Sequence, residues 1–351
     1  MTTNAFSTAP SRTNPVSATA GWGLSVLLLV AVALFGCWIV GSRPLDIGTD
    51  TSVYAAYFER LKAGQSETRM EPGFVGLSYL LSRFGLSTMA YQAALFGALM
   101  LTVWASTRRY FSYLGDTRGY LTFLSASVML LFLSPMFVNA SINAIRQGLA
   151  ALLVFASLLS FQRRQWLQFV LYGAVATSLH YSSLLYIAFA PMLVLRANTL
   201  RYVAVAGLLV YCSGLSMLIV QMLAPGLYGF IQEYAANENS RTGIRIDFAI
   251  FSAFWYAIPY FASSLLRSPY KERIQESTAV YLVMLIPFFA IGWGYFSNRF
   301  LLPAWLAVSL IMAAILCHNR FQVLRHPLAI RAGLVLSCGF FFYYVTNDVV
   351  I

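Results

Sequence analysis

The chain has 351 residues, of which 59% are hydrophobic and 10% charged, and its mean hydropathy is +0.70. Soluble domains have roughly a quarter charged residues, and a membrane β-barrel has short alternating segments in place of long apolar runs, so both classes are excluded. The net charge of +11 does not indicate nucleic-acid binding, because the basic residues lie between the apolar runs. We therefore predict an all-α, polytopic transmembrane helical bundle.

Residues 1–20 are rich in Ser, Thr, Ala, Asn and Pro, which predicts a disordered cytoplasmic tail. Residues 21–351 form a single integral membrane domain. Its apolar runs predict about 11 spans: 21–41, 87–107, 119–137, 145–161, 166–182, 183–196, 201–223, 247–266, 279–297, 300–317 and 328–347. The spans 166–182 and 183–196 are short enough to form one bent hairpin. The segment 72–84 is too short to cross a membrane and is interpreted as a re-entrant or interfacial helix.

The charges between the spans predict the orientation, because cytoplasmic connections carry an excess of Lys and Arg. The pattern fits a cytoplasmic N-terminus, a periplasmic C-terminus and two long periplasmic segments, 42–86 and 224–246. No loop is large enough for a soluble domain, so chemistry must take place in a cavity at the outer face. The excess of basic residues in cytoplasmic connections does not explain those that lie on the periplasmic side, namely Arg43, Arg60, Lys62, Arg69, Arg83, Arg146, Arg241, Arg245 and Arg299.

Arg146 lies at the start of an apolar helix that runs to about Phe161. Helix N-termini attract anions, and arginine adds a planar cation suited to phosphate. Asn139, Asn143 and Gln147 lie near it, where the apolar pattern would place no polar residue. The alternative is an interfacial arginine that reaches lipid headgroups. The cluster favours a site for a phosphate-bearing substrate at the water-facing end of the bundle.

The first outer segment holds a helix that Thr49 or Asp50 would cap and that continues to about Lys62. Asp50 is therefore either an N-cap or a carboxylate that faces a sugar hydroxyl. Tyr54 and Tyr57 follow on the same helix face. A carboxylate together with tyrosines is typical of a sugar site.

Two further outer residues have both a structural and a functional interpretation. Glu71 precedes Pro72 and either stabilises a helix start or lines the cavity as a second carboxylate. His180 lies at the outer end of a span, where a histidine is often only a hydrogen-bonding residue. Ionisable groups at membrane depth are costly, so His180 is also a candidate general base or phosphate ligand.

Three arginines follow in the second half of the chain. Arg241 and Arg245 lie in the second outer segment, where they are either solvated or grip a diphosphate or an acidic sugar. Arg299 lies in a tight outer turn between two spans and is as isolated as Arg146. No cluster has metal-ligand spacing, and there is no P-loop, dinucleotide fingerprint or nucleophile elbow. We expect no metal and no cofactor, and we interpret Cys37, Cys212, Cys317 and Cys338 as packing residues.

Five short motifs occur in a characteristic order. They are GTDT at 48–51 followed by Tyr54, EPGF at 71–74, IRQGLA at 145–150, SLH at 178–180 and SNR at 297–299. Each alone is unspecific, but the ordered set resembles the EpsG-type branch of the Wzy-like polysaccharide polymerases. The resemblance runs from about Arg43 to Pro191, and the last motif is a weaker match.

The resemblance implies a bacterial inner-membrane glycosyltransferase. Such an enzyme polymerises oligosaccharide repeat units carried on undecaprenyl diphosphate into a surface polysaccharide, such as O-antigen or exopolysaccharide, at the periplasmic face. Its partners would be these lipid-linked oligosaccharides, membrane lipids, and a chain-length regulator and flippase of the same pathway, with no nucleic acid.

The mechanism we expect is inverting glycosyl transfer without metal. Arg146 and Arg299 would neutralise the leaving diphosphate. Asp50 is the first choice of general base, followed by His180 and then Glu71. The remaining substrate-binding candidates are Tyr54, Asn143, Gln147, Arg241 and Arg245.

Three other functions compete with this one. A multi-span monosaccharide transferase that uses a polyprenyl phosphate donor would add one sugar instead of a ladder of repeat units. A flippase or exporter of lipid-linked oligosaccharides would need charges deep within its spans, whereas the ionisable residues here gather at one face. No motif supports a membrane acyltransferase.

Overall fold

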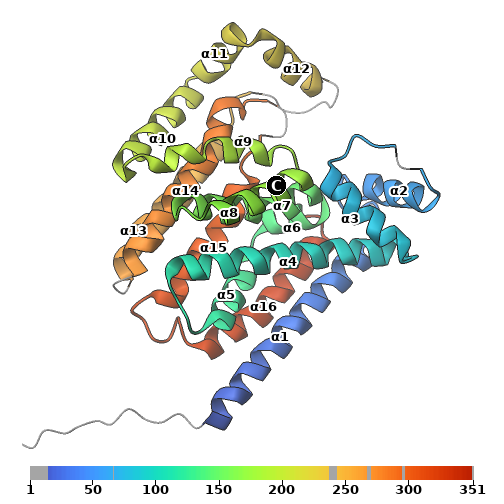
Figure 1. Cartoon of the computed structure of the whole chain (residues 1–351), viewed down its shortest axis with the longest axis vertical. Coiled ribbons are helices and arrows are strands. Elements are labelled where there is room, and N and C mark those ends of the chain that lie inside the picture. Colours follow the sequence, from blue (N-terminus) through green and yellow to red (C-terminus); the bar gives the residue numbers. More distant parts are fainter. Residues whose placement is uncertain (1–14, 66, 237–242, 267–269, 295–296, 350–351) are drawn as a thin grey trace, which may run out of the picture.

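The computed structural model describes residues 15–65, 67–236, 243–266, 270–294 and 297–349. Within these ranges the chain is built of helices and contains no β-strand, which confirms the all-α class (Figure 1). The helices are α1 (Pro15–Ser42), α2 (Thr51–Lys62), α3 (Pro72–Arg83), α4 (Thr88–Leu114), α5 (Tyr120–Phe132), α6 (Pro135–Ile142), α7 (Ile145–Gln162), α8 (Trp166–Leu179), α9 (Ser183–Ala188), η1 (Ala190–Val194), α10 (Ala197–Cys212), α11 (Leu215–Leu223), α12 (Pro225–Ala236), α13 (Ile246–Ala262), η2 (Ser263–Leu265), α14 (Tyr270–Ile291), α15 (Leu302–His318) and α16 (Pro327–Thr346).

The apolar helices make the chain a multi-pass membrane protein. Among the described residues, six helices are long and apolar enough to cross a membrane, or up to eight if each of two bent helix pairs is one span. Three further apolar segments are shorter: α8, α9 with η1, and α15. All of the predicted spans fall on one of these helices or pairs, although only six to eight qualify by length and composition.

Two predicted spans are bent where a continuous helix was expected. The span 119–137 is divided into α5 and α6 at an angle of 83°. Pro135 begins α6 and cannot continue the hydrogen bonds of α5, and Ser134 before it is extended. The span 201–223 is divided into α10 and α11, also at 83°, at Gly214, whose φ of +79° is left-handed.

The polar segments also contain helices. Helix α1 begins at Pro15, inside the range 1–20 that was predicted to be disordered, and residues 1–14 lie outside the described part of the chain. Helix α3 occupies the segment predicted to be re-entrant or interfacial. Helix α12 lies within the outer segment 224–246, which was expected to be a connection.

Helix α7 is the central helix of the bundle and packs against α4, α6, α8 and α15 (Figure 1). Every residue from Ile145 to Ser160 is buried except Arg146. Arg146 is therefore the one residue between Ile145 and Ser160 that the fold leaves partly accessible. The candidate site is built around this helix end.

Candidate functional site

Glu71 joins two cationic or potentially cationic side chains from distant parts of the sequence. Its Oε2 accepts from Arg146 Nη1 at 2.5 Å, and its Oε1 contacts His180 Nδ1 at 2.8 Å. The backbone amide of Tyr181 also donates to Oε1, at 3.4 Å. Glu71 is at the N-cap position of α3, but its side chain does not cap that helix, so both oxygens are available to these partners.

The surroundings of Glu71 favour its ionised form. Burial raises the pKa of its carboxyl group, but the hydrogen bond with His180 and the charge of Arg146 outweigh burial and hold the pKa at about 2. Glu71 is therefore a carboxylate at neutral pH. A carboxylate with so low a pKa is a weak proton acceptor, which suits it to orienting Arg146 and His180.

A close approach of two helices brings Glu71 to His180. A Cβ on Gly73, in the first turn of α3, would lie 2.7 Å from the backbone oxygen of Ser178 in α8. Only glycine permits this distance. His180 follows directly at the end of α8, where its extended backbone ends the helix. The motifs EPG and SLH therefore meet in one contact, in which Gly73 lies against Ser178 and Glu71 contacts His180.

A second ion pair lies beside the first. Arg299 Nη2 is 3.3 Å from Asp50 Oδ2, and both side chains are about 30% exposed (29% and 30%). Gln147, one residue after Arg146, donates from Nε2 to the backbone oxygen of Arg299. Asp50 occupies the N-cap position of α2 without a side-chain cap bond, so its carboxylate pairs with Arg299 instead of capping the helix.

Buried and partly buried polar contacts hold the segment 42–86 against the start of α7. Tyr54 of α2 accepts a hydrogen bond from Arg146 Nε at 3.3 Å, and burial raises the pKa of its hydroxyl. Thr49 Oγ1 lies 3.5 Å from Oδ1 of Asn143, which ends α6. Thr51 Oγ1 donates to the backbone oxygen of Ile142 at 3.1 Å and accepts from Arg43 at 3.1 Å.

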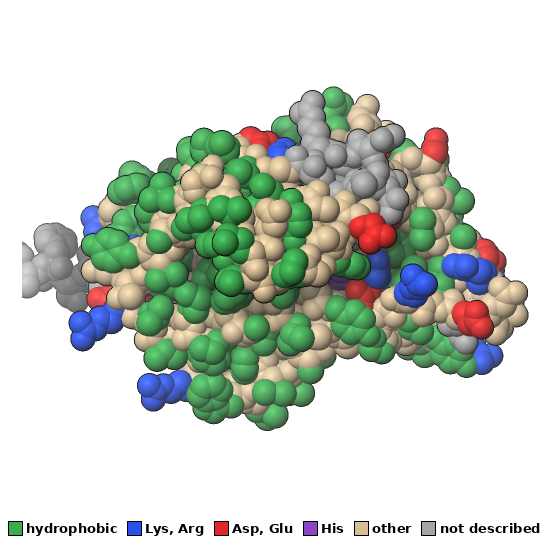
Figure 2. Space-filling model, turned by 90° about the horizontal axis from the view of Figure 1, so that it is seen from above, with side chains coloured by type: hydrophobic (Ala, Val, Ile, Leu, Met, Phe, Trp, Pro, Cys, Tyr) green, Lys and Arg blue, Asp and Glu red, His purple; other side chains and the backbone are tan. Residues whose placement is uncertain are grey.

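A cavity of about 320 Å³ opens next to these ion pairs. Its polar lining includes Gln147, His180 and Arg299, and its apolar lining includes Leu227 and Phe230 of α12. Figure 2 shows a hollow on this face, where acidic and basic side chains and a histidine lie together. The cavity thus combines a cationic, hydrogen-bonding end with an apolar wall, which suits a ligand with a charged head and a hydrocarbon chain.

Of the two remaining predicted arginines, the structure describes one. Arg241 lies outside the described residues. Arg245 forms a two-point ion pair with Asp247, at 2.9 and 2.6 Å, and stacks on the ring of Phe248. This local pairing explains why the basic residue is present, so the interpretation of Arg245 as a substrate ligand has no structural support here.

The apolar wall of the cavity was not predicted from the sequence. Leu227, Phe230 and Ile231 of α12 line the cavity at positions i, i+3 and i+4. This spacing is typical of one apolar helix face, and Pro225 is suited to a first helical turn. Both signals were present in the segment 224–246, which was predicted to be periplasmic and was assigned no helix.

The comparisons with known proteins give one family. The EpsG family profile matches residues 26–350, which is nearly the whole chain. No curated protein and no solved structure matches the sequence significantly. The match includes every described residue of the two ion pairs and the cavity. The chain therefore belongs to the EpsG family, a family of Wzy-like polysaccharide polymerases.

Proposed function

We propose that this protein polymerises oligosaccharide repeat units carried on undecaprenyl diphosphate, by inverting glycosyl transfer at the periplasmic face of the inner membrane. Membership of the EpsG family supports the polysaccharide polymerase role. The observation that carries the finer proposal is the shared cavity of His180 and Arg299, with an apolar wall on one side and the Glu71–Arg146 pair on the other.

The leaving group is a lipid diphosphate in this proposal. Arg299 lines the cavity. Arg146 is linked to His180, which also lines it, because Glu71 contacts both side chains. The start of α7 has no side-chain cap, so its amide groups add positive potential next to Arg146. The polyprenyl chain would lie along Leu227 and Phe230, which line the cavity and are 46% and 67% exposed.

The geometry supports His180 over Asp50 as the general base. The ionised Glu71 can only accept a hydrogen bond, so Nδ1 of His180 must carry the hydrogen of the pair. In the neutral imidazole this leaves Nε2 as the proton acceptor. Asp50 is already paired with Arg299, and Glu71 is too weak a base.

The reaction balances with these roles. The hydroxyl oxygen of the acceptor sugar attacks the anomeric carbon of the donor, and its proton passes to His180 Nε2. The bond between the anomeric carbon and the diphosphate oxygen breaks, and the electron pair leaves with the diphosphate. Arg299 and Arg146 stabilise this developing negative charge. The imidazolium of His180 then lies next to the Glu71 carboxylate.

The decisive experiment uses cells that lack this gene. Their surface polysaccharide is separated on a gel after complementation with wild type, Arg146→Ala, Arg146→Lys or Arg69→Ala. Arg69 is an exposed arginine of the same outer segment and is the matched control. We expect a ladder of repeat units with wild type and Arg69→Ala, and single repeat units with Arg146→Ala. Arg146→Lys should be nearly as damaging, because lysine loses the contact to Tyr54 or the one to Glu71.

Two outcomes contradict the proposal. A ladder of normal length from a well-expressed Arg146→Ala protein would exclude a catalytic role for this arginine. Loss of every repeat unit from the surface of the gene-deleted cells, including single ones, would indicate a flippase or an earlier transferase.

A further inference from the structure

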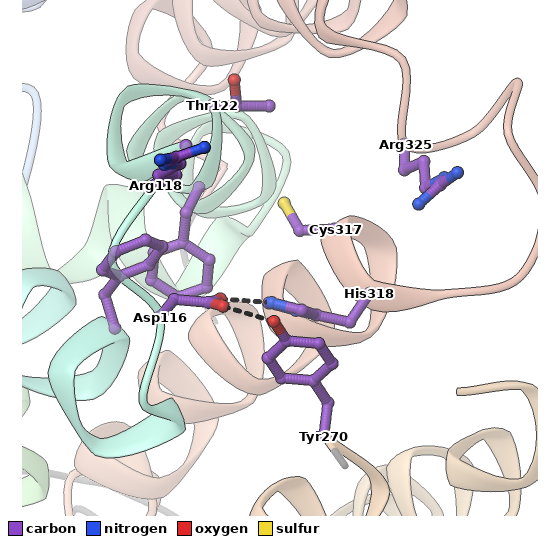
Figure 3. A pocket seen from close by; sticks show the side chains of 10 residues that line it. Asp116, Arg118, Thr122, Tyr270, Cys317, His318 and Arg325 are labelled. Atoms are coloured by element: carbon purple, nitrogen blue, oxygen red, sulfur yellow. Dashed lines mark hydrogen bonds and ion pairs between the residues drawn. The ribbon is translucent and has the colours of Figure 1, made fainter. Parts of the chain in front are cut away.

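A second polar cavity lies at the other end of the bundle from the proposed active site. Helix α15 begins at Leu302, just after Arg299, and its last residue, His318, lines the second cavity. The cavity has a volume of about 270 Å³ and lies between the connection of α4 to α5, the start of α14, and the segment after α15 (Figure 3). None of its lining residues has a role in the proposed reaction.

The one acidic side chain of this cavity that the structure describes is engaged by two partners. Tyr270 donates its hydroxyl hydrogen to Asp116 Oδ1 at 2.6 Å, and His318 Nε2 lies 2.5 Å from Oδ2. The other nitrogen of His318, Nδ1, contacts the backbone oxygen of Ala314 at 2.7 Å. Both oxygens of Asp116 therefore already have partners, and among the described residues no ion pair joins this carboxylate to Arg118 or Arg325.

Those two arginines leave the cavity with an excess of positive charge. Arg118, from the connection before α5, and Arg325, from the segment before α16, lie on opposite sides of the opening (Figure 3). Asp116 balances no more than one charge and is bound by His318 and Tyr270. An anion between the two guanidinium groups would interact favourably with both.

The start of helix α5 adds hydrogen-bond donors to the same cavity. Gly119 lines the cavity and holds the N-cap position of α5 with a φ of +84°, and no side chain caps the helix. The first amide groups of a helix have no partner within the helix and carry partial positive charge. Together with the two arginines that line the cavity, these amide groups resemble the arrangement that binds phosphate groups at helix starts.

The residues just before Arg325 indicate that a phosphate bound in this cavity would belong to a lipid. Phe321, Val323 and Leu324, directly before Arg325, are 54%, 78% and 53% exposed. Exposed apolar side chains next to basic residues at the end of membrane-spanning helices are typical of contact with the interface of an anionic membrane. We propose that this cavity binds the phosphate headgroup of an anionic phospholipid between Arg118, Arg325 and the start of α5.

The test compares lipid binding by the full-length protein, purified in a neutral detergent, in native mass spectrometry. The ligands are phosphatidylglycerol, phosphatidylcholine with the same acyl chains, and inorganic phosphate. The variant is the double substitution Arg118→Ala with Arg325→Ala. Its control, Arg164→Ala with Arg196→Ala, removes the same charge from two exposed arginines outside the cavity.

We expect wild type and the control to bind phosphatidylglycerol with similar affinity and more tightly than phosphatidylcholine. The affinity of the Arg118→Ala, Arg325→Ala protein should fall by about tenfold or more, because each charged hydrogen bond contributes at least that factor. If this protein does not fold, Arg118→Gln alone replaces it, since Arg118 is an exposed loop residue.

Two results would overturn the proposal. Unchanged phosphatidylglycerol binding by a folded double variant would exclude the cavity as the site. Inorganic phosphate that competes with phosphatidylglycerol at equal concentration would show that the acyl chains contribute nothing, and the assignment to a lipid would then be wrong. The polymer ladder of the deletion strain measures the proposed active site separately, so the two proposals can fail independently.

Discussion

Glu71 is the residue on which the geometry of the proposed active site depends most. It is nearly buried, with 5% of its side chain exposed, and it binds Arg146 and His180 through different oxygens. Replacing it with Gln keeps the shape but removes the charge, so Arg146 loses its counter-ion and His180 loses its strong acceptor. We expect Glu71→Gln to lower polymerisation by roughly 10²-fold or more, by misplacing groups that act at the substrate.

The stabilising effect of Glu71 should also depend on pH. Its pKa is about 2 in the folded protein and near the ordinary value of 4.5 in the unfolded chain. A lowered pKa stabilises the fold above the unfolded value, so the stabilisation is fully present above about pH 5 and is lost as pH falls from about 4.5 to 2. The full contribution of the Glu71 carboxylate to the free energy of unfolding is about 3 kcal/mol.

Thermal unfolding of the purified protein measures this effect. The difference in Tm between wild type and Glu71→Gln should shrink as pH falls below about 5. Glu67→Gln, an exposed carboxylate of the same segment, is the control and should change Tm little. A difference between wild type and Glu71→Gln that stays constant down to pH 3 would contradict the assigned pKa.

The general base can be identified by comparing two substitutions. Because Nε2 of His180 is the free acceptor, His180→Ala should lower the rate of repeat-unit transfer by roughly 10²- to 10⁴-fold. Asp50→Asn keeps a hydrogen-bond acceptor for Arg299 and should lower it by less than about tenfold. The rates are measured with purified protein and lipid-linked repeat units. A greater loss in Asp50→Asn would assign the base to Asp50, and an equal loss in both variants would contradict the choice of His180 as the base.

At the scale of elements, the contact between α3 and α8 sets the position of Glu71. Gly73→Ala would place a methyl group 2.7 Å from the backbone oxygen of Ser178, so the helices must separate. We expect a loss of about 1–3 kcal/mol in stability and a loss of activity. Gly76→Ala, in the same helix, meets no atom within 4 Å and should be neutral or stabilising by about 0.5–1 kcal/mol. The test measures the unfolding midpoint and the polymer ladder of both variants. Equal midpoints and equal ladders for Gly73→Ala and Gly76→Ala would contradict the role of the contact between α3 and α8.

The helices themselves were largely predictable, because hydropathy depends on local composition. The bend at Pro135 was not predicted, although proline is a local signal, because the apolar residues continue across it. Whether such a proline only kinks a helix or turns the chain by 83° depends on tertiary packing. The helix α12 was missed because the segment 224–246 was assigned as a connection between spans, and the spacing of its apolar residues was not considered.

Across the whole molecule, the sequence indicated which outer residues matter but not how they pair. Arg146, Glu71, His180 and Tyr54 were all candidates, and the structure brings them into one hydrogen-bonded group. Neither the link of Glu71 to both Arg146 and His180 nor the pairing of Arg299 with Asp50 follows from spacing. Both depend on contacts between segments that are about 75 to 249 residues apart. The pairing of Arg245 with Asp247, two residues away, was not considered in the sequence analysis, and the role of Arg245 in substrate binding stays a prediction.

The orientation of the bundle in the membrane links both proposed sites and can be measured directly. The basic residues predict that the Arg146 end faces the periplasm and the Arg325 end faces the cytoplasm. In a protein whose four native cysteines are replaced by Ala, Gln65→Cys and Gln322→Cys place one exposed thiol at each end. A membrane-impermeant maleimide should label Gln65→Cys in cells with a permeabilised outer membrane and label Gln322→Cys only after lysis. The reverse pattern would place the proposed active site in the cytoplasm, where it could not act on repeat units already exported, and would also move the lipid site to the periplasmic leaflet.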